Sequence, residues 1–186
     1  MNPVTYHLCH DRYDGWQDHD KLLGIYSTKE KAEAALALLR HKPGFRDHPD
    51  GFEVLDGPID ETYWLEGFLS LWGDEEPDPN HVPGSGKRVL FTSIDPMPQT
   101  YWVLWHRYAQ EAGIFEEKLI GTYTSRENAE KGIELVRDQP GFREHLNGFV
   151  ITEGTLDQTD MIDGFITVRE DNRERDEPIC DATQES

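Results

Sequence analysis

Hydrophobic and polar positions follow the same order twice along this chain. The segment from Lys21 to Phe68 matches the segment from Lys118 to Phe165 at a constant offset of 97 residues, without a gap. Upstream, residues 7–10 (HLCH) match residues 103–106 (VLWH) at an offset of 96, so the polar stretch in between differs in length. Such a stretch is expected to be a loop. The chain is therefore predicted to be a tandem duplication.

Each copy is predicted to begin with two strands and a helix. Short runs of aromatic and branched residues indicate strands at 6–9 and 22–26 in copy one, and at 102–105 and 119–123 in copy two. The helix follows as apolar positions spaced i, i+3, i+4 and i+7, which form one stripe that faces a sheet. These positions are Ala32, Ala35, Leu36 and Leu39 in copy one, and Ala129, Gly132, Ile133 and Val136 in copy two.

Both ends of the helix carry a signal. Ser27 in copy one and Thr124 in copy two are expected to be the N-caps, each with a glutamate three residues later to complete a capping box. The helix must end before Pro43 or Pro140, because proline disfavours helical geometry in the residue that precedes it.

The remaining elements complete a β-β-α-β-β unit. A third strand is expected at GFEV or GFVI, and a fourth that ends in Gly67-Phe68 or Gly164-Phe165. The predicted fold class is α+β, with two tandem repeats that each form a small, mainly antiparallel sheet with one helix on one face. The other sheet face or a sheet edge is free to meet the second copy, so the repeats are expected to dock on each other.

This pattern divides the chain into four parts. Residues 1–72 form copy one and residues 101–169 form copy two. Residues 73–100 contain an acidic linker rich in proline and glycine, followed by an extra strand, RVLFTSI. Residues 170–186 hold seven acidic residues and two arginines and few apolar residues, so a disordered tail is expected.

Composition and charge narrow the classes of partner. Hydrophobic residues make up 36% of the chain, which is lean for 186 residues, so each copy alone is expected to be marginally stable. The net charge is −19, from 37 acidic and 18 basic residues spread over both copies. Such a chain repels nucleic acid and anionic membranes, whereas a basic protein surface would attract it. High solubility alone is the alternative explanation.

The location is expected to be cytoplasmic. The N-terminal residues MNPVTYHLCH lack a signal peptide's basic and apolar regions, and no stretch of about 18 apolar residues occurs. Cys9 in a strand and Cys180 in the acidic tail make neither a disulfide framework nor a metal site, so both are expected to be reduced thiols.

No common catalytic signature occurs. GSGK at 84–87 fails as a phosphate loop, because His81 stands where the motif requires glycine and Arg88 follows the lysine. The nucleotide, hydrolase and metal motifs GxGxxG, GxSxG, HExxH and CxxC are absent. We expect no enzyme activity, no catalytic residue, no cofactor and no bound metal.

An Arg-acid-His sequence after the helix is the best remaining candidate for chemistry. It places Arg46 and His48 in copy one, and Arg143 and His145 in copy two, at equivalent loop positions. If the loop is a binding site, its arginine would bind an anion through two parallel N–H donors, and its histidine would be a partner that gains or loses a proton. If the loop is only structural, the arginine and the histidine would hydrogen-bond loop carbonyls, and the phenylalanine of the loop, Phe45 or Phe142, would fill the core.

Differences between the copies offer a second kind of candidate. Trp64 and Trp72 are replaced by Met161 and Arg169 in copy two, and Trp105 replaces Cys9, so the copies are not equivalent in function. Trp72 lies beside an acidic run and is the preferred partner contact, with the alternative that it covers the junction between copies. The acidic residues are Asp74, Glu75 and Glu76.

The pattern VLWH, KLIGxYxSxxxA, PGFR and GF resembles a family of small, uncharacterised bacterial domains. The resemblance covers most of residues 4–70 and 101–168, and copy two follows the pattern more closely, because copy one departs from it at HLCH. The family has no established catalytic residues to carry over. Some similar proteins look like the immunity members of toxin and immunity pairs in interbacterial competition.

Three functions remain open. The leading hypothesis is an immunity protein that binds a cognate toxin with a basic, nucleic-acid-targeting domain and occludes its active site. The second is a general interaction or regulatory adaptor, in which the two copies present a paired surface. The third is an enzyme with a novel site on the Arg-acid-His loops.

Overall fold

The structure, a computed structural model, describes residues 4–13, 18–63, 97–109 and 115–162. Its elements follow the same order in both copies. Copy one contains β1 (Val4–Tyr13), β2 (Asp18–Tyr26), α1 (Lys29–Leu39), the 3-10 helix η1 (Pro49–Gly51), β3 (Phe52–Pro58) and β4 (Glu61–Thr62). Copy two contains β5 (Thr100–Ala109), β6 (Phe115–Tyr123), α2 (Arg126–Val136), the 3-10 helix η3 (Leu146–Gly148), β7 (Phe149–Thr155) and β8 (Gln158–Thr159). The predicted α+β class is confirmed.

The strands form two antiparallel four-stranded sheets, and each sheet takes one strand from the other copy. The first sheet has the order β3-β1-β2-β8, and the second has the order β4-β6-β5-β7. β8 of copy two pairs with β2 at Gly24 and Ile25, while β4 of copy one pairs with β6 at Gly121 and Thr122. The expectation that each copy holds all four of its own strands in one sheet is therefore wrong.

Gly24 and Gly121, each two residues before the end of its strand, allow this exchange. A Cβ atom on Gly24 would stand 2.5 Å from the carbonyl oxygen of Gln158, and a Cβ atom on Gly121 would collide with the carbonyl oxygen of Glu61. Because both oxygens belong to the backbone of a paired strand, neither can move aside cheaply. The glycine of the repeated KLLG and KLIG sequences thus marks the position where the other copy's strand approaches.

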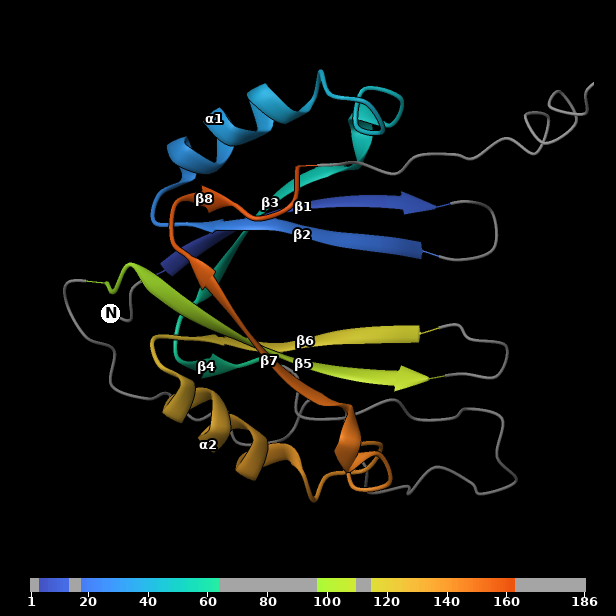
Figure 1. Cartoon of the computed structure of the whole chain (residues 1–186), viewed down its shortest axis with the longest axis vertical. Helices are drawn as coiled ribbons and strands as arrows, with labels where there is room; N and C mark the ends of the chain where they lie inside the picture. The colour runs from blue at the N-terminus through green and yellow to red at the C-terminus, as the bar shows by residue number, and fades with distance from the viewer. Residues whose placement is uncertain (1–3, 14–17, 64–96, 110–114, 163–186) are drawn as a thin grey trace, which may run out of the picture.

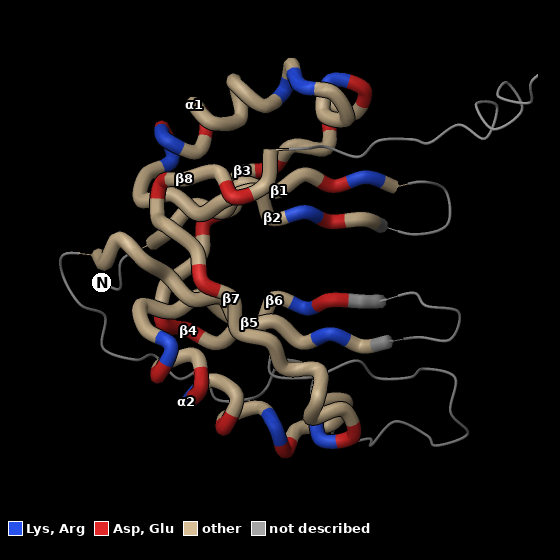
Figure 2. Tube along the Cα trace, in the orientation of Figure 1, with Lys and Arg blue, Asp and Glu red and all other residues tan. Residues whose placement is uncertain are grey.

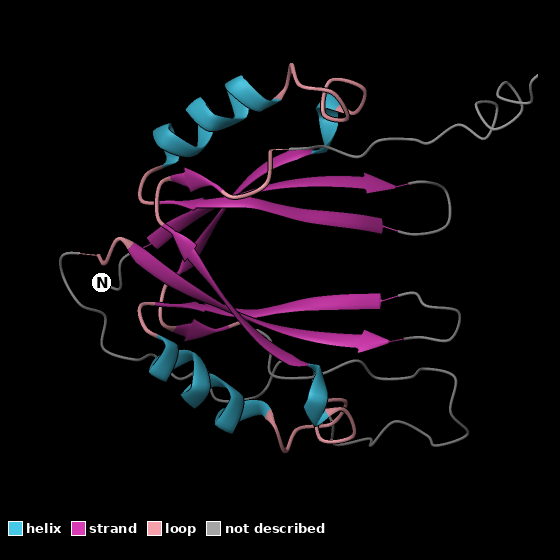
Figure 3. Ribbon diagram, in the orientation of Figure 1, coloured by secondary structure: helices cyan, strands magenta, loops and turns pink. Residues whose placement is uncertain are grey.

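The elements stack in four layers, helix, sheet, sheet and helix (Figures 1 and 3). Each helix covers the outer face of one sheet and closes a core around a phenylalanine, Phe45 or Phe142. A third apolar cluster contains residues of both copies, with Ile25 from copy one and Tyr101, Val103 and Leu156 from copy two. The predicted helix stripes contribute Ala32, Leu39, Ala129, Gly132 and Val136 as buried residues.

The helix caps lie one residue later than expected. Thr28 caps α1 by accepting a hydrogen bond from the amide of Lys31, and Ser125 caps α2 by accepting one from Asn128. Ser27 and Thr124, the expected caps, instead bind carboxylates that arrive from the other copy. Both helices end before the proline of their copy, as predicted.

The strands differ from their predicted limits. β1 and β2 continue through charged pairs such as Asp11–Asp20, which carry no apolar signal although their backbones pair. The two-residue strands β4 and β8 precede the GF sequences that were expected to end the fourth strands. Those GF sequences, residues 73–96 of the predicted linker with the extra strand at 88–94, and the acidic tail lie outside the described residues. The last residue of the predicted linker, Thr100, already belongs to β5. Neither of the helices that the structure describes is long and apolar enough to cross a membrane.

Candidate functional site

The loop that follows each helix is fixed by a buried histidine on the first strand. His10 Nε2 donates to the carbonyl oxygen of His48 at 2.8 Å, and His106 Nε2 donates to that of His145 at 3.0 Å. Both rings are fully buried and pack edge-on against the phenylalanine of the loop. Burial lowers the pKa of both histidines, although the carbonyl contact opposes the shift. The rings that bind loop carbonyls are therefore those of the strand histidines.

The loop arginines point to their own neighbours. Arg46 lies 3.5 Å from Asp47, and Arg143 lies 2.5 Å from Glu144, in pairs with exposed side chains. The expectation that these arginines hydrogen-bond loop carbonyls receives no support from these pairs. The expectation that Phe45 and Phe142 fill the core is confirmed, since both are fully buried.

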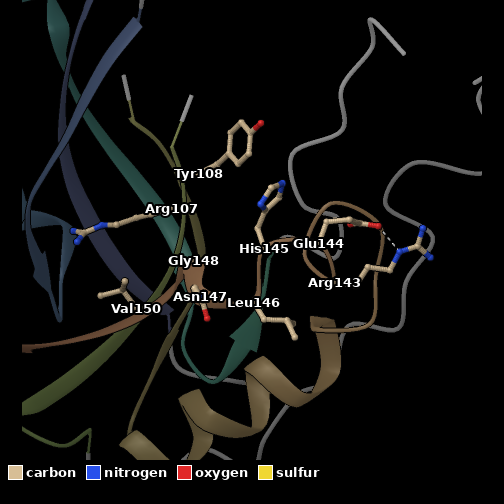
Figure 4. Close-up of a pocket in the computed structure, with 9 residues that line it drawn as sticks. All are labelled: Arg107, Tyr108, Arg143, Glu144, His145, Leu146, Asn147, Gly148 and Val150. Carbon is tan, nitrogen blue, oxygen red and sulfur yellow. Dashed lines mark hydrogen bonds and ion pairs between the residues drawn. The ribbon is translucent and has the colours of Figure 1, made fainter. Parts of the chain in front are cut away.

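In copy two, a depression lies beside this loop. It has a volume of about 610 Å³ and is open to solvent. Figure 4 shows the rings of Tyr108 and His145 on one side, with Arg107 and Arg143 directed away from each other on opposite flanks. Its lining residues are Arg107, Tyr108, Arg143, Glu144, His145, Leu146, Asn147, Gly148 and Val150. The depression therefore brings two of the predicted residues together with residues of β5, η3 and β7.

The equivalent surface of copy one has different chemistry. Four of the nine positions keep the same kind of side chain in both copies. The other five change from Arg107, Tyr108, Leu146, Asn147 and Val150 in copy two to Asp11, Arg12, Pro49, Asp50 and Glu53 in copy one. Copy one thus presents an acidic surface where copy two presents ring, aliphatic and amide groups.

A second constellation lies where the copies exchange strands. The turn between β3 and β4 carries Asp60, which is fully buried and adopts a left-handed backbone conformation with φ of 60°. Its carboxylate accepts hydrogen bonds from the amide and the hydroxyl of Thr124, at 2.8 and 2.7 Å, and from the side chain of Asn128 at 3.1 Å. Asp60 therefore fixes the exchanged turn to the start of α2.

Asp157 makes the equivalent contact from copy two to copy one. It also has a positive φ, 66°, and accepts hydrogen bonds from the amide and the hydroxyl of Ser27. Lys31 of α1 adds an ion pair at 2.6 Å. Partial burial raises the pKa of this carboxyl, but the contacts with Lys31 and Ser27 lower it more. Asp157 is exposed, so the two contacts are alike in geometry and unlike in environment.

A polar cluster lies between the two sheets. His7 Nε2 is 3.2 Å from Thr5 Oγ1 and 3.5 Å from Thr122 Oγ1 of copy two, while the Thr5 hydroxyl donates to the carbonyl of Gly57. The ring of Tyr63 lies 6.3 Å away. Burial lowers the pKa of His7 to about 4, so the imidazole is neutral at neutral pH. Copy two has Val103 at the equivalent position.

The remaining predicted site residues cannot be placed. Trp72, Asp74, Glu75 and Glu76 lie outside the described residues. Sequence reasoning missed Arg107, Tyr108 and Val150, although aligning the copies would have shown their replacement by Asp11, Arg12 and Glu53. It also missed Asp60 and Asp157, which occur at equivalent positions in both copies.

Within the described ranges, no group of three or more histidine, cysteine or carboxylate side chains could hold a metal ion. Comparison of the chain with protein-family models, with curated proteins and with solved structures finds no match in any of the three.

Proposed function

We propose that this chain is an immunity protein, which binds a cognate bacterial toxin with a basic, nucleic-acid-targeting domain and occludes its active site. The observation that carries the proposal is the acidic edge of copy one, defined by Asp50, Glu53 and Asp56, whose side chains are all exposed. Copy two has Asn147, Val150 and Glu153 at the equivalent positions. An acidic edge of this kind would steer a basic partner toward one side of the molecule.

The arrangement of the copies supports binding by steric occlusion. Figure 2 shows acidic residues on α2 and on the sheet strands, whereas α1 carries as many lysines as glutamates. The exchanged strands and the shared apolar cluster favour a docked pair that presents one preformed surface. A preformed surface loses less conformational freedom on binding than a flexible one, which favours a long-lived complex.

Co-purification from native cells tests the proposal. An immunity protein is expected to bring down one dedicated partner in a fixed ratio, and the chain should protect cells that produce this partner. Several partners would instead favour the adaptor function, and the absence of any partner would contradict both. Failure to protect against the product of the neighbouring gene would also count against the immunity function.

The acidic edge can be tested separately once the partner is known. Replacing Asp50 by Asn, the residue of copy two, together with Glu53→Gln should slow association by about threefold and weaken its dependence on salt. The control removes two charges from exposed positions of α2, with Glu127→Gln and Glu134→Gln. Equal slowing in both variants would show that overall charge, and not this edge, directs the partner.

The loop histidines can be tested without loss of the loop. His48→Ala and His145→Ala remove the rings but keep the backbone carbonyls to which His10 and His106 donate. Both variants should therefore fold. If the loops contact the partner, dissociation becomes faster, whereas unchanged binding would remove His48 and His145 from the interface.

A further inference from the structure

We propose that the inner face of the first sheet, near the end of β1 and the start of β2, binds an arginine side chain of the partner protein. This inference rests on the protein-binding function proposed above and names the place and the chemistry of one contact. The inner face is the surface that the first sheet turns toward the second, and its residues at this end are Cys9, Asp11, Asp20, Leu22, Glu53 and Leu55.

Strand alternation puts these six side chains on one face. His7 of β1 reaches a threonine of the second sheet, so Cys9 and Asp11 also belong to the inner face. The side chains in between, of which His10 is one, pack on the phenylalanines of the core under α1. The strand register then places Leu22 and Glu53 opposite Cys9, Asp20 opposite Asp11, and Leu55 opposite His7.

Three carboxylates lie close together on this face. Asp11 and Asp20 stand directly opposite each other on paired strands, an arrangement that is destabilising for like charges. Glu53 stands beside them on β3. Burial, followed in size by the charges of these three residues, raises the pKa of Cys9 to about 12. The three carboxylates therefore act on one point of the face.

Copy two carries a completed ion pair at the same place. The positions equivalent to the two aspartates hold Arg107 and Glu117, whose charged groups lie 2.5 Å apart. Among the residues that the structure describes, neither Asp20 nor Glu53 forms an ion pair. Both side chains are exposed. Copy one thus offers two accessible carboxylates to a cation from another molecule, where copy two has already satisfied its charges.

The geometry of the face suits a guanidinium. Side chains that stand opposite each other on paired strands have Cβ atoms about 5 Å apart, so one planar group with donors on two edges can bind both carboxylates. The apolar surface beside them suits the aliphatic part of an arginine, because Leu55 is 50% exposed and Leu22 is half-buried. A bare metal ion fits less well, since no group of three histidine, cysteine or carboxylate side chains in the described ranges could hold one.

The test uses the full-length chain and a small probe, so it does not require the partner. N-acetyl-L-argininamide, whose only charged group is the guanidinium, is titrated against the isotope-labelled protein while amide resonances are followed by NMR. Saturable shifts are expected at Cys9, Asp20 and Glu53 in the millimolar range, as is usual for a ligand of this size. N-acetyl-L-citrullinamide, which has nearly the same shape and no charge, should bind about fivefold more weakly.

Two variants at equivalent positions of the copies separate binding from structure. Asp20→Asn should weaken binding of the arginine probe by about fivefold, because one carboxylate is lost. The same variant should raise the denaturant midpoint, because the repulsion from Asp11 is relieved. Glu117→Gln, the matched control in copy two, should leave binding unchanged and lower the midpoint, because it breaks the ion pair with Arg107.

Three results would overturn the proposal. They are the absence of saturable shifts in the native chain, equal binding of the citrulline compound, and a lower denaturant midpoint for Asp20→Asn, which would make its carboxylate part of the fold. A failed titration would leave the immunity function standing, and failure to protect cells would leave the titration result unaffected.

Discussion

His7 shows how one residue makes the junction between the sheets sensitive to pH. Nε2 of the neutral ring lies within hydrogen-bonding distance of threonine hydroxyls of both copies, but the imidazolium would be a charge buried between two sheets. Burial lowers the pKa of His7 from its ordinary value of 6.5 to about 4 in the folded chain. The folded state therefore resists a proton that the unfolded state accepts.

The sign of this effect follows from linkage. The contribution of His7 to stability is complete above pH 6.5 and is lost as the pH falls toward 4. At pH 5 the loss should be about 2 kcal/mol. His7→Val, which introduces the residue of copy two, should remove this part of the dependence of the unfolding free energy on pH between 7 and 5. Denaturant unfolding at several pH values measures it, and an unchanged slope in the variant would show that His7 is not protonated on unfolding.

At the scale of elements, the turns before β4 and β8 give Asp60 and Asp157 a role that the hydrophobic pattern of a single copy could not predict. Their two aspartates form the same contact, but Asp60 is fully buried with three hydrogen bonds and Asp157 is exposed. Alanine at either position would also strain a backbone with positive φ. The two substitutions therefore differ in the burial of the carboxylate and in its helix partner, which is Asn128 for Asp60 and Lys31 for Asp157.

Asp60→Ala should lower the unfolding free energy by about 3 kcal/mol, and Asp157→Ala by about 1 kcal/mol. The larger loss has a physical cause, because the buried amide and hydroxyl of Thr124 would be left without the carboxylate. Chemical denaturation followed by circular dichroism measures both values, with Asp60→Asn as a variant that keeps one acceptor oxygen. Equal losses at the two positions would contradict the assigned role of burial.

The sequence predicted the elements well where the signal was local. The helix stripes, the prolines beyond the helices and the phenylalanines of the loops all depend on neighbours within one copy, and each behaves as expected. The cap predictions were wrong because Ser27 and Thr124 match a capping pattern but bind aspartates that lie 130 and 64 residues away. Nothing in a local pattern can distinguish these two uses of a hydroxyl.

The candidate site was predictable only in part for a related reason. Arg143 and His145 stood out as members of a repeated sequence. Tyr108 and Val150 belong to strands and resemble ordinary strand residues, so only their position around the depression reveals them. The copy comparison would have shown the substitutions but not that they share one surface.

At the scale of the whole molecule, strand exchange should hold the two copies together without the covalent link between them. A protease site inserted within residues 73–86, the predicted linker, allows this to be measured. After cleavage the two halves should elute together in size-exclusion chromatography, because each sheet still holds a strand of the other half. Separation of the halves under native conditions would show that the exchanged strands and the shared cluster do not suffice. The halves of the cleaved Asp60→Ala variant should dissociate faster than the halves of the cleaved native chain.

The exchange also sets the order in which the protein can be completed during synthesis. Thr159 pairs with Gly24, which precedes it by 135 residues. The edge of β2 is therefore left without its β8 partner while nearly all of copy two is still being translated. A chain that ends within copy two, before Asp157, would have an open edge on its first sheet, and its α1 would lack the contact from Asp157. The first sheet can therefore be completed only after the C-terminal copy has been synthesised.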